Sequence, residues 1–317
     1  MILVGGITRL THSGLSIVEW QPIVGAVPPL DAAQWEEAFA KYRKTPEFRL
    51  RNHDMTLAAF KGIFWWEFVH RFLGRIVGLA FLLPFLYFLA KRRIDRALAW
   101  KLAAIFGLGA VQGAMGWYMV ASGLVDDPRV SQFRLAAHLG LAFAIYGAML
   151  WIALGLLAVS QPALASRSVE RLGTALVAIV FAMVMTGALV AGIRAGYAYN
   201  TFPLMNGHFI PPEILMIDPW WKNFGYNMAT VQFDHRAIAW VLAIVVAVMW
   251  WLAMRAPSTG PRARAWAHAL LGALVVQFAL GVAALVNGAP LALAAFHQAG
   301  AVVLFTCAIG LRRSLGT

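Results

Sequence analysis

Long runs of apolar residues alternate with short polar connectors along most of the chain. Each run has about 20 residues or more, the length that an α-helix needs to cross the roughly 30 Å hydrocarbon core of a bilayer. The runs lie at residues 68–90, 100–122, 133–159, 172–193, 229–254, 265–287 and 291–311. The pattern therefore predicts an all-α polytopic membrane protein with seven complete transmembrane helices.

The N-terminus predicts one further helix that is incomplete. Residues 1–7 are apolar but have only about a third of the length of a crossing. No cleavable signal, with a basic start and a small-residue exit, accompanies them. We expect this stretch to be the end of a first transmembrane helix that is truncated in this chain.

The placement of the charged residues predicts the orientation in the membrane. The net charge of +12 would suggest a nucleic-acid partner in a soluble protein. Here Lys and Arg gather in the connectors that follow the spans ending near residues 90, 159, 254 and 311. The connector at 123–131 has Asp126 and Asp127 against Arg129, and that at 288–290 has no charge. Because cytoplasmic connectors carry the excess of basic residues, we expect the bilayer as a partner, no nucleic acid, and a cytoplasmic C-terminus.

Short motifs recur along the chain at similar offsets in residue number. Residues 67–71 (EFVHR) match 232–236 (QFDHR), and residues 111–116 match 276–281 at the same offset of 165, while residues 4–7 (VGGI) match 190–193 (VAGI) at an offset of 186. A shared offset predicts two similar halves, and a unit of four helices returns the second half to the same orientation. We therefore expect eight transmembrane helices arranged as two parallel-repeat four-helix bundles.

The repeat also predicts the domain organisation. The N-terminal half covers residues 1–160 and includes a long extracytoplasmic segment at 8–66. The C-terminal half covers residues 161–317 and has its own extracytoplasmic segment at 194–228.

Four of the eight histidines, His70, His138, His235 and His297, lie inside predicted spans. All four spans run from outside to inside, and each histidine lies within about two turns of the outer end. Intramembrane imidazoles usually face the interior of a bundle, and two of them on different helices can ligate haem iron from opposite sides. Taken singly, such a histidine equally predicts an interhelical hydrogen bond. Four at one depth favour a haem in each half over a zinc site, for which Cys and carboxylates are too few.

Other residues near these histidines have two interpretations each. Arg71 and Arg236, next to two of the histidines, can pair with haem propionates or extend to lipid phosphates. Gly74 and Gly78 follow His70 at helical spacing and predict a smooth helix face for a porphyrin or a neighbouring helix. Gly140 and Gly300 are expected to act similarly near His138 and His297.

One difference between the halves predicts different roles for them. Glu67 precedes His70 by three residues, whereas the matching residue before His235 is Gln232. A carboxylate beside a haem can accept or deliver a proton, and an amide cannot. The asymmetry favours chemistry at the N-terminal site and a resident haem at the C-terminal site.

A set of short motifs lies in the N-terminal part of the chain. The motifs are 5–11 (GGITRLT), 13–16 (SGLS), 46–49 (PEFR), 55–56 (MT) and 64–67 (FWWE), followed by His70, Arg71, Gly74 and Arg75. Together they resemble the motifs of haem A synthase. The resemblance covers nearly the whole chain and is closest to the proteobacterial and mitochondrial branch. It implies an eight-helix protein of two four-helix halves.

The resemblance implies an oxidoreductase that converts a ring methyl group of haem O to a formyl group by successive hydroxylations. The product, haem A, serves cytochrome c oxidase. By the same resemblance, His70 and His138 hold the substrate haem, His235 and His297 hold the iron of a haem b cofactor, and Glu67 is catalytic. Haem O synthase (protohaem farnesyltransferase), cytochrome oxidase assembly factors and an electron donor are the implied protein partners.

The chain departs from some bacterial members because its single cysteine, Cys307, cannot form the extracytoplasmic cysteine pair that they carry. No transit peptide precedes the motifs, which favours a bacterial cytoplasmic (inner) membrane. The alternative function is a di-haem b-type electron carrier, which has no need of an acid at one haem only. A transporter is disfavoured because the spans are apolar below the histidines.

Overall fold

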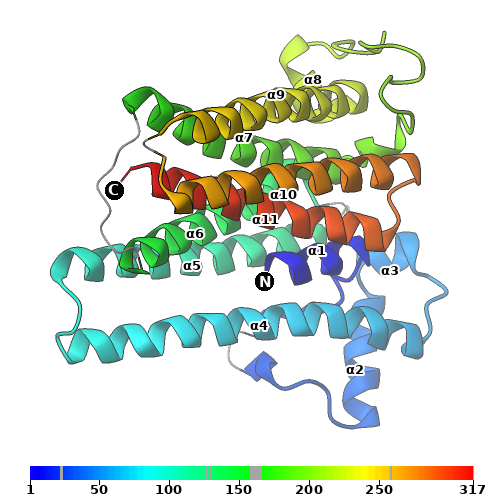
Figure 1. Cartoon of the computed structure of the whole chain (residues 1–317). Coiled ribbons are helices and arrows are strands. Elements are labelled where there is room, and N and C mark those ends of the chain that lie inside the picture. The colour runs from blue at the N-terminus through cyan, green and yellow to red at the C-terminus, as the bar shows by residue number, and fades with distance from the viewer. Residues whose placement is uncertain (22–23, 126–127, 129, 158–165, 258, 317) are drawn as a thin grey trace. The chain divides into compact units, whose positions relative to one another are not determined.

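The computed structural model describes residues 1–21, 24–125, 128, 130–157, 166–257 and 259–316 (Figure 1). Within these residues the regular structure is helical, apart from one isolated bridge between Met205 and His208. The helices are α1 (Ile2–Leu10), α2 (Ala32–Arg43), α3 (Pro46–Arg51), α4 (Leu57–Ala90), α5 (Arg96–Gly123), α6 (Gln132–Leu157), α7 (Arg167–Gly192), α8 (Asn223–Tyr226), α9 (Met228–Arg255), α10 (Pro261–Val286) and α11 (Leu291–Leu315). Three short 3₁₀ turns lie at Val24–Ala26, Ala195–Tyr197 and Trp220–Lys222.

Seven of the described helices, α4, α5, α6, α7, α9, α10 and α11, are long and apolar enough to cross a membrane. They coincide with the seven predicted runs to within a few residues at most ends, which confirms a multi-pass, all-helical membrane protein. Residues 158–159 of the third run, like the connector residues Asp126, Asp127 and Arg129, lie outside the described residues. The apolar N-terminus forms α1, and the arrangement of eight helices as two repeats stays a prediction.

Helix α4 begins well before the predicted span, at Leu57. Thr56 caps it, because its hydroxyl accepts a hydrogen bond from the backbone N–H of Ala59 (3.3 Å). The additional outer turns bury Phe60 and Phe64 against Trp35, Phe39 and Tyr42 of α2. Part of the segment predicted as extracytoplasmic therefore continues a membrane-spanning helix and stabilises the position of Glu67, further along the same helix.

The chain divides into two compact units, Met1–Arg134 and Leu135–Thr317. In the first unit, α1, α2 and α5 each pack on α4. In the second unit, α7 packs on α9 and α11, and α10 lies alongside α9 and α11 (Figure 1). The predicted boundary at residues 160 and 161 lies outside the described residues, so the division into two haem-binding halves stays a prediction.

Candidate functional site

Glu67 is buried in the first unit, and its carboxylate accepts three hydrogen bonds. Oε2 accepts from the Ser16 hydroxyl (2.7 Å) and from the backbone N–H of Ile17 (2.8 Å), while Oε1 accepts from Nη2 of Arg71 (2.6 Å). The side chain of Arg71 lies one turn further along α4, and Glu67 as a whole is 2% exposed. Three donors therefore fix both oxygens of the carboxylate, an arrangement that suits an ionised acid.

The segment that supplies two of these donors, residues 16–21, lies along α4, and we term it the N-terminal strap. Arg71 donates to the backbone carbonyls of Ile17 (2.9 Å) and Glu19 (3.0 Å), and Arg75 donates to that of Gln21 (2.8 Å). The guanidinium of Arg71 also lies over the ring of Trp20, 5.8 Å from its centroid. Arg71 is thus engaged by protein acceptors, and its pairing with a haem propionate stays a prediction.

The second unit has a matching segment at residues 199–204, the C-terminal strap, which lies along α9. Arg236 donates to the carbonyls of Tyr199 and Thr201, both at 2.9 Å. Gln232 is 3% exposed and donates from Nε2 to the same Tyr199 carbonyl (3.0 Å). The residue three positions before the histidine therefore has different partners in the two units. Glu67 accepts from the Ser16 hydroxyl and the Ile17 backbone, whereas Gln232 donates to the Tyr199 backbone carbonyl.

Contacts to the repeated motif give the two straps an offset in residue number that differs from the offset of residues 4–7. Ile17 and Tyr199, which contact equivalent arginines, differ by 182 in residue number, and so do Glu19 and Thr201. The offset of 186 taken from residues 4–7 differs from 182 by about one helical turn. A sequence match of four small or apolar residues fixes helix register poorly, whereas a shared contact identifies equivalent positions.

The same offset of 182 relates two glycines that lie against histidine rings. A Cβ on Gly5 of α1 would lie 2.9 Å from Nε2 of His70, and one on Gly187 of α7 would lie 3.2 Å from Cε1 of His235. In α10, a Cβ on Gly281 would lie 2.8 Å from Cε1 of His297. Backbone therefore approaches three of the four imidazoles at positions where a larger side chain would displace the ring.

His235 and His297 lie in one unit, on α9 and α11. Nδ1 of His235 is hydrogen-bonded to the Thr186 hydroxyl (2.9 Å), which leaves Nε2 as the ring nitrogen that can face a metal. The oriented imidazole and the glycines beside both rings fit a haem held between two histidines. His70 lies in the first unit and His138, on α6, in the second, so the other predicted pair is divided between the units.

The sequence interpretation missed Ser16, Thr186 and the three glycines that contact imidazoles. The glycines chosen instead have other neighbours: a Cβ on Gly74 would meet the Met1 methyl group, one on Gly140 would meet Met185, one on Gly300 would meet Gln277, and one on Gly78 would meet nothing within 4 Å. Gly281 belongs to a repeated motif, and Gly5 to the family motif, and both signals were available in the sequence. Nothing in the sequence linked Ser16 to Glu67 or Thr186 to His235.

A second buried acid, Glu47 of α3, lies in the same unit as Glu67 and is 3% exposed. The Tyr42 hydroxyl donates to it (3.4 Å), and Asn52 donates to that hydroxyl (2.7 Å). Burial raises the pKa of Glu47 to about 7, although the charge of Arg51 opposes the shift, and burial also raises the pKa of Tyr42. Glu47 can therefore change its charge near neutral pH.

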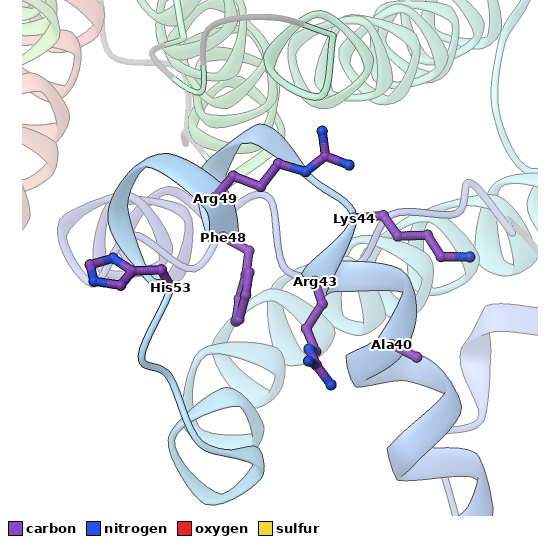
Figure 2. A pocket seen from close by; sticks show the side chains of 6 residues that line it. All are labelled: Ala40, Arg43, Lys44, Phe48, Arg49 and His53. Atoms are coloured by element: carbon purple, nitrogen blue, oxygen red, sulfur yellow. The ribbon is translucent and has the colours of Figure 1, made fainter.

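A cationic pocket of about 500 Å³ lies on α2, α3 and the turn after them (Figure 2). Its lining comprises Ala40, Arg43, Lys44, Phe48, Arg49 and His53. Figure 2 shows that the basic side chains point in different directions rather than toward one point. The pocket contains none of the predicted site residues. In the described part of the chain, no group of three or more His, Cys, Asp or Glu side chains is placed to hold a bare metal ion.

Comparison with known proteins agrees with the motifs and the fold. The family model for cytochrome oxidase assembly proteins matches residues 1–309. The heme A synthase of Nitrosospira multiformis is 58% identical over 99% of this chain and 89% of its own length, and that of Nitrosomonas eutropha is 52% identical over the same shares. The heme A synthase of Paracoccus denitrificans is 47% identical over 98% of this chain and 83% of its own length. These matches confirm the resemblance seen in the sequence, and the chain belongs to the cytochrome oxidase assembly protein family.

Proposed function

We propose that this protein is a haem A synthase, a membrane oxidoreductase that converts haem O to haem A for cytochrome oxidase. The observation that carries the proposal is the 52–58% identity to heme A synthases over 99% of the chain. It is supported by the acid Glu67 at a position where the repeated motif has Gln232. The di-haem electron carrier explains neither of these. Glu67 lies one turn from His70, and Gln232 replaces it before His235.

In the N-terminal half, His70 and His138 are the proposed axial ligands of the substrate haem, and Glu67 is the proposed catalytic residue. Conversion of a methyl group to a formyl group removes hydrogen from carbon, so the site needs a group that accepts protons. Glu67 is suited to this task because Ser16, Ile17 and Arg71 hold its carboxylate in one orientation. Its burial next to the histidine excludes bulk water from the acid.

In the C-terminal half, His235 and His297 are the proposed ligands of a haem b cofactor. When bound, haem b supplies one-electron transfer. Thr186 sets the orientation of the His235 ring, and Gln232 and Arg236 hold the C-terminal strap against α9 without placing an acid there. The residues of this half therefore suit a resident redox group better than a reacting substrate.

The proposed location is a bacterial cytoplasmic (inner) membrane, with the C-terminus in the cytoplasm. Haem O synthase is the expected source of the substrate, and cytochrome oxidase assembly factors and an electron donor are the other expected partners. Arg312 and Arg313 in the last turn of α11 fit the cytoplasmic side, where basic residues accumulate.

The proposal is tested by producing the full chain together with a haem O synthase and identifying the haems extracted from the purified protein. We expect haem b together with haem O or haem A, and conversion of haem O to haem A in membranes. If the protein holds haem b alone and leaves haem O unchanged, it is an electron carrier and the proposed function is wrong.

A further inference from the structure

The C-terminal strap is attached to two helices. On one side Arg236 of α9 holds its backbone carbonyls. On the other side the Asn200 side chain donates a hydrogen bond to the carbonyl of Leu285 near the end of α10 (2.8 Å). The strap thereby closes the space between α9 and α10.

An aromatic triad strengthens this closure. Phe202 of the strap stacks on Trp240 of α9 (ring centroids 6.2 Å apart) and packs edge-on against Phe278 of α10 (5.9 Å). Trp240 and Phe278 also contact each other (5.1 Å). Such ring pairs add stability beyond the apolar area that they bury.

Among the described residues, the N-terminal strap is attached to α4 and, through an ion pair between Glu19 and Lys41 (2.8 Å), to α2, but it makes no hydrogen bond to α5. Arg71 and Arg75 attach it to α4, as described above, but Val18 occupies the position equivalent to Asn200 and has no side-chain donor. Val120 of α5 is the equivalent of Leu285. A pocket of about 60 Å³ lies between the strap and α5, and its lining comprises Val18, Trp20, Arg71, Trp117, Val120, Ala121 and Leu124.

The aromatic triad is also missing from the first unit. The residues equivalent to Phe202, Trp240 and Phe278 are Trp20, Arg75 and Gly113. Trp20 is 47% exposed, and a Cβ on Gly113 would meet no atom within 4 Å. In the described residues of the first unit, the contact between strap and α5 therefore lacks the hydrogen bond made by Asn200 and the three-ring contact made by Phe202, Trp240 and Phe278.

We infer that the seam between the N-terminal strap and α5 is the passage through which the haem substrate enters and the product leaves. The inference rests on the proposed function, because it assigns exchange to the half that carries Glu67. A volume of about 60 Å³ holds about two water molecules, so the strap has to part from α5 to admit a macrocycle. Separation of the N-terminal strap from α5 breaks no hydrogen bond like the one between Asn200 and Leu285. The closed seam between the C-terminal strap and α10 instead retains the haem of that half.

The first experiment weakens the contact between the C-terminal strap and α10. Phe278→Gly gives α10 the residue found at the equivalent position of α5, and Val275→Gly, at a side chain that is 62% exposed on the same helix, controls for a glycine within α10. Full-length protein loaded with haem b is mixed with excess apomyoglobin, and haem transfer is followed by absorbance. We expect Phe278→Gly to speed haem release about tenfold or more and Val275→Gly to leave it unchanged. Equal release rates in Phe278→Gly and the unmodified protein would overturn the inference.

The second experiment strengthens the contact between the N-terminal strap and α5. Val18→Asn restores a donor opposite Val120, and Gly113→Phe restores a ring, so each variant checks the other if one folds poorly. We expect the rates of haem O binding and release both to fall about tenfold, while the equilibrium affinity changes little. This result is expected because the substitutions raise the barrier to passage and do not alter the contacts of the bound haem. Unchanged rates in both variants would refute the passage. If the unmodified protein does not convert haem O, the proposed function fails, but the release experiment on the second unit still stands.

Discussion

Glu67 and Gln232 occupy equivalent positions of the repeat, yet their hydrogen bonds run in opposite directions. Glu67 accepts from the backbone N–H of Ile17, and Gln232 donates to the backbone carbonyl of Tyr199. In both units an arginine four residues later holds the adjacent strap. The partners of each residue therefore match its side chain, because donors face the carboxylate of Glu67 and an acceptor faces the amide N–H of Gln232. Exchanging the acid and the amide would place a buried donor against a donor, or a buried acceptor against an acceptor.

Glu67→Gln is expected to abolish most turnover while the protein keeps its haems. Loss of a group that accepts protons typically costs a factor of about 10² to 10⁴ in rate. Haem A formation in membranes and haem content by extraction measure the two properties separately. Glu37→Gln, at an exposed acid paired with Lys41, is the matched control. Full haem A production by Glu67→Gln would rule out the catalytic role of Glu67.

Ser16→Ala is expected to reduce kcat roughly 10- to 100-fold with a smaller change in KM, because a hydrogen bond to a charged group contributes about 1.5–3 kcal/mol. Ser16→Thr keeps the hydroxyl and should restore most of the rate. Ser13→Ala removes another fully buried hydroxyl close by, one that is bonded to Thr11 instead of Glu67. If Ser13→Ala and Ser16→Ala have the same effect, Ser16 acts through local folding and not through Glu67.

Thr186→Val is expected to weaken haem binding in the C-terminal half about 10- to 100-fold, because it removes the partner of Nδ1 that orients His235. Haem titration and the midpoint potential of the bound haem both report the change. Thr306→Val, which removes a hydroxyl bonded to Tyr146, serves as the control in the same unit. An unaltered affinity and potential in Thr186→Val would show that the His235 ring is oriented by packing alone.

Glu47→Gln is expected to make stability less dependent on pH. The pKa of Glu47 is raised from 4.5 to about 7 by burial, so the folded chain holds this proton more tightly than the unfolded chain. As the pH rises from 4.5 to 7 the unfolded state ionises first, and stability falls by up to about 3 kcal/mol before levelling off.

Thermal unfolding in detergent between pH 5 and pH 8 measures this effect. Glu47→Gln should be more stable relative to the unmodified protein at pH 8 than at pH 5. Glu36→Gln, at an exposed side chain of α2, should show no such trend. A stability difference that is constant with pH would mean that Glu47 does not change its charge in this range.

The amino-acid sequence alone predicted the seven spans, the four intramembrane histidines, the motif repeat and the difference between Glu67 and Gln232. These features depend on the length of apolar runs and on residue type, which can be read directly along the chain.

The neighbours of the site residues could be identified only from the folded chain. Ser16 reaches Glu67 across 51 residues and Thr186 reaches His235 across 49, through loops whose paths no local pattern specifies. The offset of 182 between the two straps could also be found only from contacts in the folded chain. The packing of Gly5 against the His70 ring, and of Gly187 against the His235 ring, is one such contact. The attachment of the N-terminal strap to α4 and α2, with no hydrogen bond to α5 among the described residues, likewise depends on contacts between segments far apart in the chain, which sequence periodicity does not encode.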